Sequence, residues 1–124
     1  MTRVTRNVAP EAADDLLERP PRASLAFTAG TTLIAMPVAF RRCDGRYWIG
    51  LLPDGSDPAP QPGAIVTLLI DTGWYWFELR AIKLRGRLES APQPPAGGPV
   101  ELNWLELIPD KIVAWDYDTL REES

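Results

Sequence analysis

Apolar and polar residues alternate along most of the chain from residue 23 onward, a pattern that predicts short antiparallel strands. The first candidates are Ala23–Thr28 and Leu33–Phe40. The second is apolar almost throughout, and its Pro37 indicates an edge, a bulge or a gap in the strand ladder. Asp44-Gly45 is a strong two-residue hairpin signal, and it predicts a turn into a third strand, Arg46–Leu52.

The second half of the chain continues the same pattern. Ala64–Ile70 is β-branched and apolar, which is typical of a buried strand. Asp71–Gly73 predicts a turn, and the aromatic cluster Trp74–Phe77 follows it and leads into a long alternating strand ending near Glu89. The last strand candidates are Val100–Ile108 and Ile112–Tyr117, separated by a turn or kink at Pro109-Asp110.

Helical features are confined to the beginning of the chain. Met1–Val8 is expected to be an arm, and Pro10–Glu18 predicts one short helix that Pro20-Pro21 ends. Pro53–Gly63 and Ala91–Pro99 are too rich in Pro and Gly to be helical. The sequence thus predicts a mainly β fold, a six-stranded antiparallel barrel with one short N-terminal helix. The expected parts are an arm and helix over 1–22, a barrel domain over 23–118 and a tail over 119–124.

Composition narrows the possible functions. The net charge of −4 disfavours nucleic acid as a partner. No apolar run approaches the ~20 residues of a membrane span, and the N-terminus lacks the apolar core of a signal peptide, so we expect a cytoplasmic protein with no membrane partner. The chain has no histidine and one cysteine, Cys43, so we expect no metal site. Chemistry here has to rely on carboxylates, Tyr, Arg, water or a bound cofactor.

Four cations lie close together on the long alternating strand. Lys83, Arg85 and Arg87 share one face, whereas Arg80 begins the apolar face and needs an anionic or carbonyl partner. That partner is either a carboxylate of the fold, such as Asp116 or Glu106, or a ligand. The cluster Trp74–Phe77, together with Trp48, Trp104 and Trp115, is interpreted as core or dimer-interface packing, with ring stacking against a ligand as the alternative.

Several segments, in this order, resemble a known superfamily. They are RASLAF, PVAFR, DGRYWIG, ELRAIKLRGRLE and IPDKIVAWDYDTL, and with the short helix they span Leu16 to Leu120. The chain resembles the FMN-binding split-barrel superfamily related to pyridoxamine 5'-phosphate oxidase. The resemblance implies a split β-barrel of the Greek-key type, a homodimer, and two flavin sites in the grooves between subunits. The implied cofactor is FMN or a deazaflavin.

The resemblance also places eight residues around the cofactor. The flavin ring would lie along the backbone of the second strand, and Arg side chains with a serine would hold the phosphate. The residues are Pro37, Val38 and Ala39 beside the ring, Arg41 (or its neighbour Arg42) and Ser56 on the phosphate side, Arg80 and Arg87 on the cationic strand, and Trp115 in the closing segment.

The sequence departs from the superfamily pattern at three places. Ser56-Asp57-Pro58 stands where S-R-K is common, Thr119 stands where lysine is frequent, and Ala91–Pro99 replaces a helical insertion. Two functions therefore stay open. One is a flavin-binding protein, an FMN- or deazaflavin-dependent oxidoreductase of a small substrate. The other is a cofactor-free split-barrel dimer with a structural or small-ligand-binding role. The sequence assigns no catalytic residue.

Overall fold

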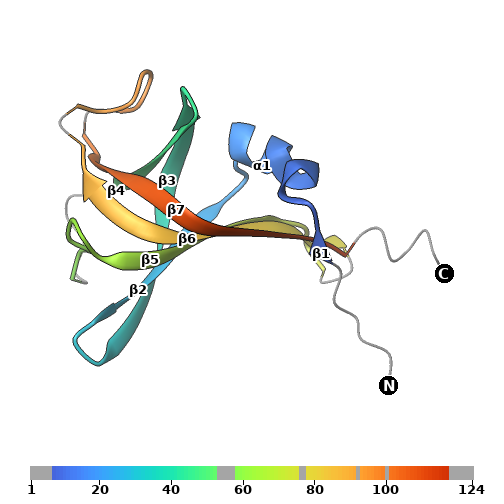
Figure 1. The fold of residues 1–124 in the computed structure, drawn as a ribbon, viewed down its shortest axis with the longest axis horizontal. Helices are drawn as coiled ribbons and strands as arrows, with labels where there is room; N and C mark the ends of the chain where they lie inside the picture. The colour runs from blue at the N-terminus through green and yellow to red at the C-terminus, as the bar shows by residue number, and fades with distance from the viewer. Residues whose placement is uncertain (1–6, 53–57, 76–77, 92, 100, 118–124) are drawn as a thin grey trace.

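A computed structural model describes residues 7–52, 58–75, 78–91, 93–99 and 101–117. Within these residues, six antiparallel strands close into a barrel, and a short seventh strand lies outside it (Figure 1). The elements are β1 (Asn7–Val8), a 3₁₀ turn (Pro10–Ala13), α1 (Asp14–Glu18), β2 (Ala23–Ala29), β3 (Thr32–Cys43), β4 (Arg46–Leu51), β5 (Ile65–Thr72), β6 (Arg80–Ser90) and β7 (Asn103–Asp116).

The strands follow the spatial order β1-β7-β4-β3-β2-β5-β6, and pairing of β6 with β7 closes the barrel. Every pairing is antiparallel. The predicted fold class is therefore confirmed. The predicted N-terminal helix is also confirmed, since the 3₁₀ turn and α1 together cover Pro10 to Glu18.

Alternation along the strands directs one set of apolar side chains into the barrel. Leu25, Leu68, Ile82 and Leu84 are completely buried there. The short helix closes one end of the barrel, because Leu16 and Leu17 of α1 join the same core cluster. In the view of Figure 1 this helix lies above β6 and β7.

The barrel is split between β3 and β4. β3 pairs with β2 through Thr32–Val38, but with β4 only through Ala39–Cys43. The Thr32–Val38 segment therefore has one open edge among the described residues, and the β2–β3 hairpin extends away from the barrel (Figure 1). Pro37 lies in this half-paired segment, which agrees with the edge, one of the three alternatives predicted for it.

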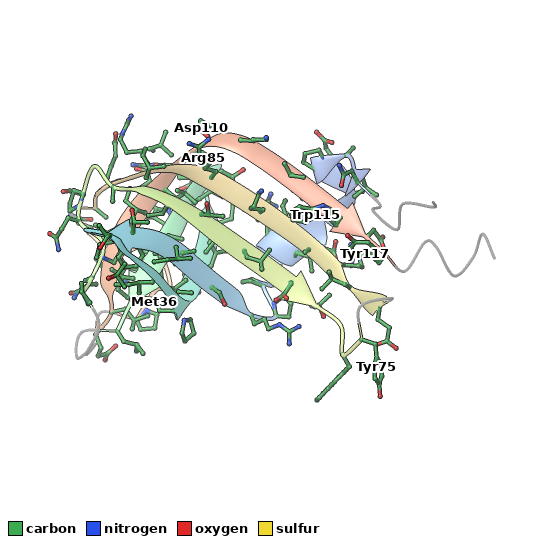
Figure 2. The ribbon with its side chains drawn as sticks, turned by 90° about the horizontal axis from the view of Figure 1, so that it is seen from below. Met36, Tyr75, Arg85, Asp110, Trp115 and Tyr117 are labelled. Atoms are coloured by element: carbon green, nitrogen blue, oxygen red, sulfur yellow. The ribbon has the colours of Figure 1, made fainter. Side chains whose placement is uncertain are left out.

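Trp74 and Tyr75, the described part of the aromatic cluster, do not enter the core. β5 continues through Asp71 and Thr72, Gly73 turns the chain with φ of 113°, and β6 begins only at Arg80. Trp74 is 94% exposed and Tyr75 is 63% exposed, so the core half of the prediction is wrong for these two residues, and packing at a dimer interface stays a prediction. Figure 2 shows Tyr75 pointing away from the sheet at its end. Trp76 and Phe77 lie outside the described residues.

The predicted break at Pro109-Asp110 is a β-bulge inside one strand. β7 runs without interruption past Pro109, but its register against β6 shifts there: Arg85 pairs with Lys111, whereas Gly86 pairs with Pro109. Asp110 is the extra residue, so the proline is accommodated without ending the strand. A Cβ atom on Gly86 would lie 2.1 Å from the Ile108 carbonyl oxygen, so only glycine fits this close approach.

Candidate functional site

A groove follows the open edge of β3. It has a volume of about 440 Å³ and is lined by Ala29, residues 32–35 and Pro58. We call it the β3-edge groove. Its wall combines small and apolar side chains with the β3 edge, whose backbone N–H and C=O groups pair with no second strand among the described residues, a setting suited to a flat, hydrogen-bonding ring. None of the residues that line it is Lys or Arg, so its described wall offers a phosphate no cation.

The three residues predicted beside the ring lie where β3 changes partners. Val38 is the last residue paired with β2, and Ala39 is the first paired with β4. Ser56 and Asp57 lie outside the described residues. Pro58 lines the groove with residues of β3, which brings the end of this loop back to the strand edge. The predicted ring-binding segment and the groove are therefore adjacent.

Arg41 and Arg42 point to opposite faces of β3. The Arg42 guanidinium donates hydrogen bonds to both Asp14 carboxylate oxygens at 2.5 and 3.0 Å, and also to the Glu18 carboxylate. These bonds raise the pKa of Arg42 and tie α1 to the barrel. Arg41 is exposed on the outer face, with its guanidinium close to Gly97.

Arg80 is held by carboxylates of the fold. Its guanidinium donates to the two Asp15 oxygens at 2.9 and 2.7 Å and to the Ala12 carbonyl at 3.1 Å. Asp116 lies 3.6 Å from its Nε, so one of the two expected carboxylates does pair with it. The other expectation, Glu106, is wrong, because Glu106 pairs with Arg46. The hydrogen bonds from Arg80 lower the pKa of Asp15.

The remaining predicted residues lie on β6 and β7. Arg87 is exposed, donates to Glu89 at 2.6 Å and sits opposite Ile65 of β5. Trp115 lies under the Lys83 ammonium, 5.5 Å from its ring centroid. In Figure 2, Trp115 on β7 and Met36 on β3 lie at well-separated places on the molecule. The fold of one chain thus does not gather the described predicted residues into a single cluster. Pro37–Ala39 directly follow the groove-lining part of β3 without lining the groove themselves, whereas Arg41, Arg80 and Trp115 lie elsewhere.

The sequence interpretation missed the ion pair between Arg46 and Glu106. Arg46 Nε donates to Glu106 at 2.8 Å and Nη2 at 2.5 Å, a bidentate arrangement across β4 and β7. Glu106 is 8% exposed, and the Arg46 guanidinium also lies 4.8 Å from the Trp48 ring centroid. Glu106 lies on the outward face of a largely apolar segment, and this alone could have indicated that it needs a cationic partner. Which residue is the partner depends on the register of β4 against β7.

We expect this pair to make stability depend on pH. The hydrogen bonds from Arg46 lower the pKa of Glu106 below its ordinary value of 4.5, so the unfolded chain binds more protons than the folded chain in acid. The stabilisation is therefore full above pH 4.5 and is lost as pH falls through the lower folded pKa. Urea denaturation of wild type and Glu106→Gln should give curves that converge in acid. A difference independent of pH would contradict this assignment.

Comparison with known proteins gives a likeness at the level of fold. No family model and no curated protein matches the sequence. Among solved structures, the FAD binding protein from Mycobacterium smegmatis matches with a TM-score of 0.69 and 14% identity over 87% of this chain and 96% of its own. The conserved hypothetical protein Rv2991 from Mycobacterium tuberculosis matches with a TM-score of 0.70 and 15% identity, covering 98% and 92% of the two chains.

A third solved structure has the same fold. A Corynebacterium glutamicum protein named after pyridoxamine 5'-phosphate oxidase matches with a TM-score of 0.66 and 12% identity over 90% of this chain and 96% of its own. These likenesses show the fold: the chain has the same split-barrel fold as the three solved structures. In the described part of the chain, no helix is long and apolar enough to span a membrane, and no cluster of three metal-binding side chains is found.

Proposed function

We propose that the protein binds a flavin in the β3-edge groove and works as a cytoplasmic homodimer. The observation that carries this proposal is the split itself, which leaves the backbone edge of Thr32–Val38 beside a cavity large enough for a flavin ring. Two matching structures, from Mycobacterium smegmatis and Mesorhizobium loti, are named as FAD-binding proteins, which supports the same ligand class here.

The residues around the β3-edge groove suit the ring of a flavin better than they suit its phosphate. Ring edges need donors and acceptors, and the unpaired edge of β3 offers both, except that Pro37 has no N–H to give. Leu33 and Ala35 supply apolar contacts from the groove wall. Pro37, Val38 and Ala39 would hold the ring, while Arg41, Ser56, Arg80, Arg87 and Trp115 stay proposals for the rest of the cofactor, with a partner subunit supplying some of them. When bound, a flavin supplies hydride or electron transfer for a small substrate.

One observation favours the second function, a cofactor-free dimer. Arg80 and Arg42, both candidates for anion binding, are engaged with carboxylates of the short helix. Engaging a ligand phosphate instead would break these charge-assisted hydrogen bonds. The two functions differ in a directly measurable way, because the cofactor-free protein would be colourless and would not bind flavin.

Flavin binding is tested by titrating the purified protein with FMN, FAD and a deazaflavin, with absorbance between about 350 and 500 nm as the readout. We expect saturable binding of at least one of them. Ala35→Phe places a ring inside the groove and should weaken binding at least tenfold, about 1.4 kcal/mol. Arg85→Ala, on the exposed face of β6, is the control and should leave affinity unchanged. No binding of any flavin at millimolar concentration would favour the cofactor-free dimer.

The dimer is proposed from apolar surface that one chain leaves uncovered. Leu33 is 71% exposed and Ile65 is 54% exposed, and both line one shallow depression beside the β2–β3 hairpin. Exposed apolar surface of this kind is typical of an interface. Sedimentation should show a dimer at micromolar concentration, and Leu33→Asp should shift it to monomer, whereas Arg85→Ala should not. A stable wild-type monomer would refute the proposal.

A further inference from the structure

Four cations lie together on the outer face of the sheet, where β6 pairs with β7. Lys83, Arg85 and Arg87 occupy alternate positions of β6, between the buried residues of that strand, and Lys111 of β7 lies directly opposite Arg85. We call these four residues the cationic face. Alternate residues of a strand are about 7 Å apart, so the three cations of β6 form a row of ~14 Å. This row lies on a protein whose net charge is −4.

The β-bulge places two like charges directly across from each other. Arg85 and Lys111 are register partners, and the Cβ atoms of such a pair lie about 5 Å apart. Like charges in this arrangement destabilise a sheet. The register is fixed here, because Gly86 lies against the Ile108 carbonyl at a distance that admits no side chain. The fold therefore holds two cations side by side although they repel each other.

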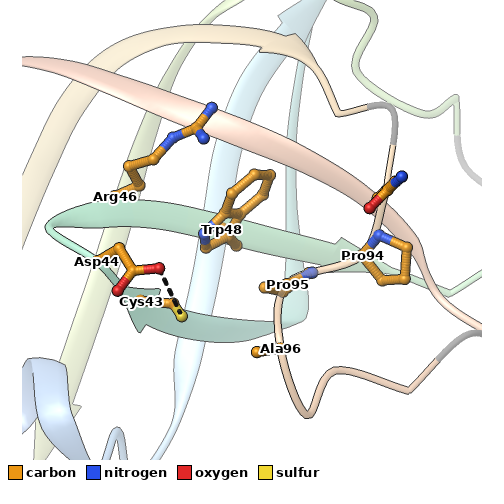
Figure 3. A pocket seen from close by; sticks show the side chains of 8 residues that line it. Cys43, Asp44, Arg46, Trp48, Pro94, Pro95 and Ala96 are labelled. Carbon is orange, nitrogen blue, oxygen red and sulfur yellow. Dashed lines mark hydrogen bonds between the residues drawn. The ribbon is translucent and has the colours of Figure 1, made fainter.

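Two neighbouring arginines of the same outer face are already paired with carboxylates. Arg46 of β4 has Glu106 at 2.5 Å, and Figure 3 shows its side chain beside the pocket that residues 93–96 line. Arg87, at the end of the row, has Glu89 at 2.6 Å. These two arginines therefore carry their own counter-charge, and an outside anion would have to compete for them.

Arg85 and Lys111 are exposed and have no such partner within the described part of the chain, where no hydrogen bond or ion pair includes either side chain. Figure 2 shows Asp110, the extra residue of the bulge, near Arg85, but Asp110 forms no ion pair with a described cation. Lys83 lies 5.5 Å from the Trp115 ring centroid rather than beside a carboxylate. An anion from outside the chain would therefore relieve the repulsion between Arg85 and Lys111.

Apolar side chains border the row of cations on both neighbouring strands. Lys83 lies between Leu69 of β5 and Val113 of β7, which are its register partners. Leu69 is 36% exposed, and Val113 is partly exposed. A peptide can bury such apolar surface with the carbon atoms of its side chains, whereas a phosphate chain offers little to cover it. The spacing also fits a peptide, because an extended chain presents alternate side chains about 7 Å apart, as the row does.

We propose that the cationic face binds a short, extended acidic segment of a partner protein. One carboxylate of the segment would lie between Arg85 and Lys111, and the carboxylate two positions away would reach Lys83. The row of ~14 Å corresponds to about five residues of extended chain. A long polyanion would continue past the row onto an acidic protein surface. A short segment avoids this repulsion, because charges more than ~8 Å away are largely screened at physiological salt.

The test is a titration of the full chain into a fluorescein-labelled peptide of eight residues in which Glu alternates with Thr, followed by fluorescence anisotropy. We expect saturable binding that weakens as the salt concentration rises. Arg85→Glu and Lys111→Glu should each weaken binding about tenfold or more. Arg19→Glu, which reverses the charge of another exposed arginine, outside the cationic face, is the control and should bind as wild type.

Stability measurements separate a binding role from a structural one. Arg85→Ala and Lys111→Ala each remove the like-charged pair, so urea denaturation should show both variants at least as stable as wild type, while both bind the peptide more weakly. A loss of stability in both variants would show that the pair supports the fold rather than a partner, and would overturn the proposal. Neither residue lines the β3-edge groove, so this result is independent of flavin binding.

Two other probes decide which chemistry the cationic face recognises. The same peptide with Gln in place of Glu should not bind, and single-stranded oligothymidylate of eight nucleotides should bind more weakly than the acidic peptide. The proposal is overturned if the acidic peptide does not bind, if the Gln peptide binds as tightly, or if the oligonucleotide binds more tightly than the acidic peptide.

Discussion

Trp104→Ala should lower the free energy of unfolding by about 3–5 kcal/mol, the largest single effect expected here. Trp104 is 7% exposed, although it lies outside the barrel. Its ring lies against Gly50 and Gly98, since a Cβ on either glycine would come within 3.0 Å of it. The substitution removes this packing together with the hydrogen bond to Pro99, so the loop over residues 93–99 should lose its anchor as well.

Urea denaturation at neutral pH measures the loss, and amide hydrogen exchange over residues 93–99 measures the release of the loop. Trp74→Ala is the matched control, because it also removes one tryptophan but from a position that is 94% exposed. Its free energy of unfolding should stay within about 0.5 kcal/mol of wild type. Equal losses in the two variants would show that Trp104 is not part of the packed structure described above.

Gly86→Ala should destabilise the protein by about 3 kcal/mol or more. The added Cβ would lie 2.1 Å from the Ile108 carbonyl oxygen and 2.7 Å from the Ile108 carbonyl carbon. These are backbone atoms of the neighbouring strand, so the strands have to separate at the bulge. A shorter β6–β7 ladder also weakens the pairing that closes the barrel.

Gly50→Ala provides the comparison for this substitution. A Cβ on Gly50 would meet Leu102 and Trp104 side chains at 3.0 Å, and side chains can move by a few tenths of an ångström where backbone cannot. Both variants replace a strand glycine, so the intrinsic cost of the residue change is the same. Thermal unfolding should rank Gly86→Ala well below Gly50→Ala, and the reverse order would argue against the β6–β7 register.

Period-two alternation was enough to predict the barrel strands, because each strand has one face in a shared core. Pro37 limited its part of β3 to an edge, a bulge or a ladder gap, and the structure has the edge. The same reasoning failed for Trp74 and Tyr75. Alternation cannot show whether large aromatic residues continue a strand or form the connection between two strands. Here the chain turns at Gly73, so Trp74 and Tyr75 belong to the connection between β5 and β6.

The candidate site was less predictable because its contacts join residues far apart in the sequence. Arg80 was expected to need a carboxylate, and the nearest partner is Asp15, 65 positions earlier, in a helix whose docking no local pattern encodes. The Arg46–Glu106 pair depends on strand register across 60 positions. The resemblance to a superfamily directed attention to β3, whereas the contacts of the loop over residues 93–99 depend on how it folds onto Trp104.

The pairing of β7 with three other strands determines when the barrel can close during synthesis. β7 pairs with β1, β4 and β6, and β1 pairs with Ala114 and Trp115, so the earliest described strand finds its partner only when nearly all of β7 has been made. During synthesis the β2–β3 hairpin and the β5–β6 hairpin can form locally, but the barrel stays open until β7 has left the ribosome. Such distant pairing slows folding. It also exposes unpaired strand edges in the nascent chain, so its yield in cells should respond to chaperone supply more than that of a helical protein of equal size.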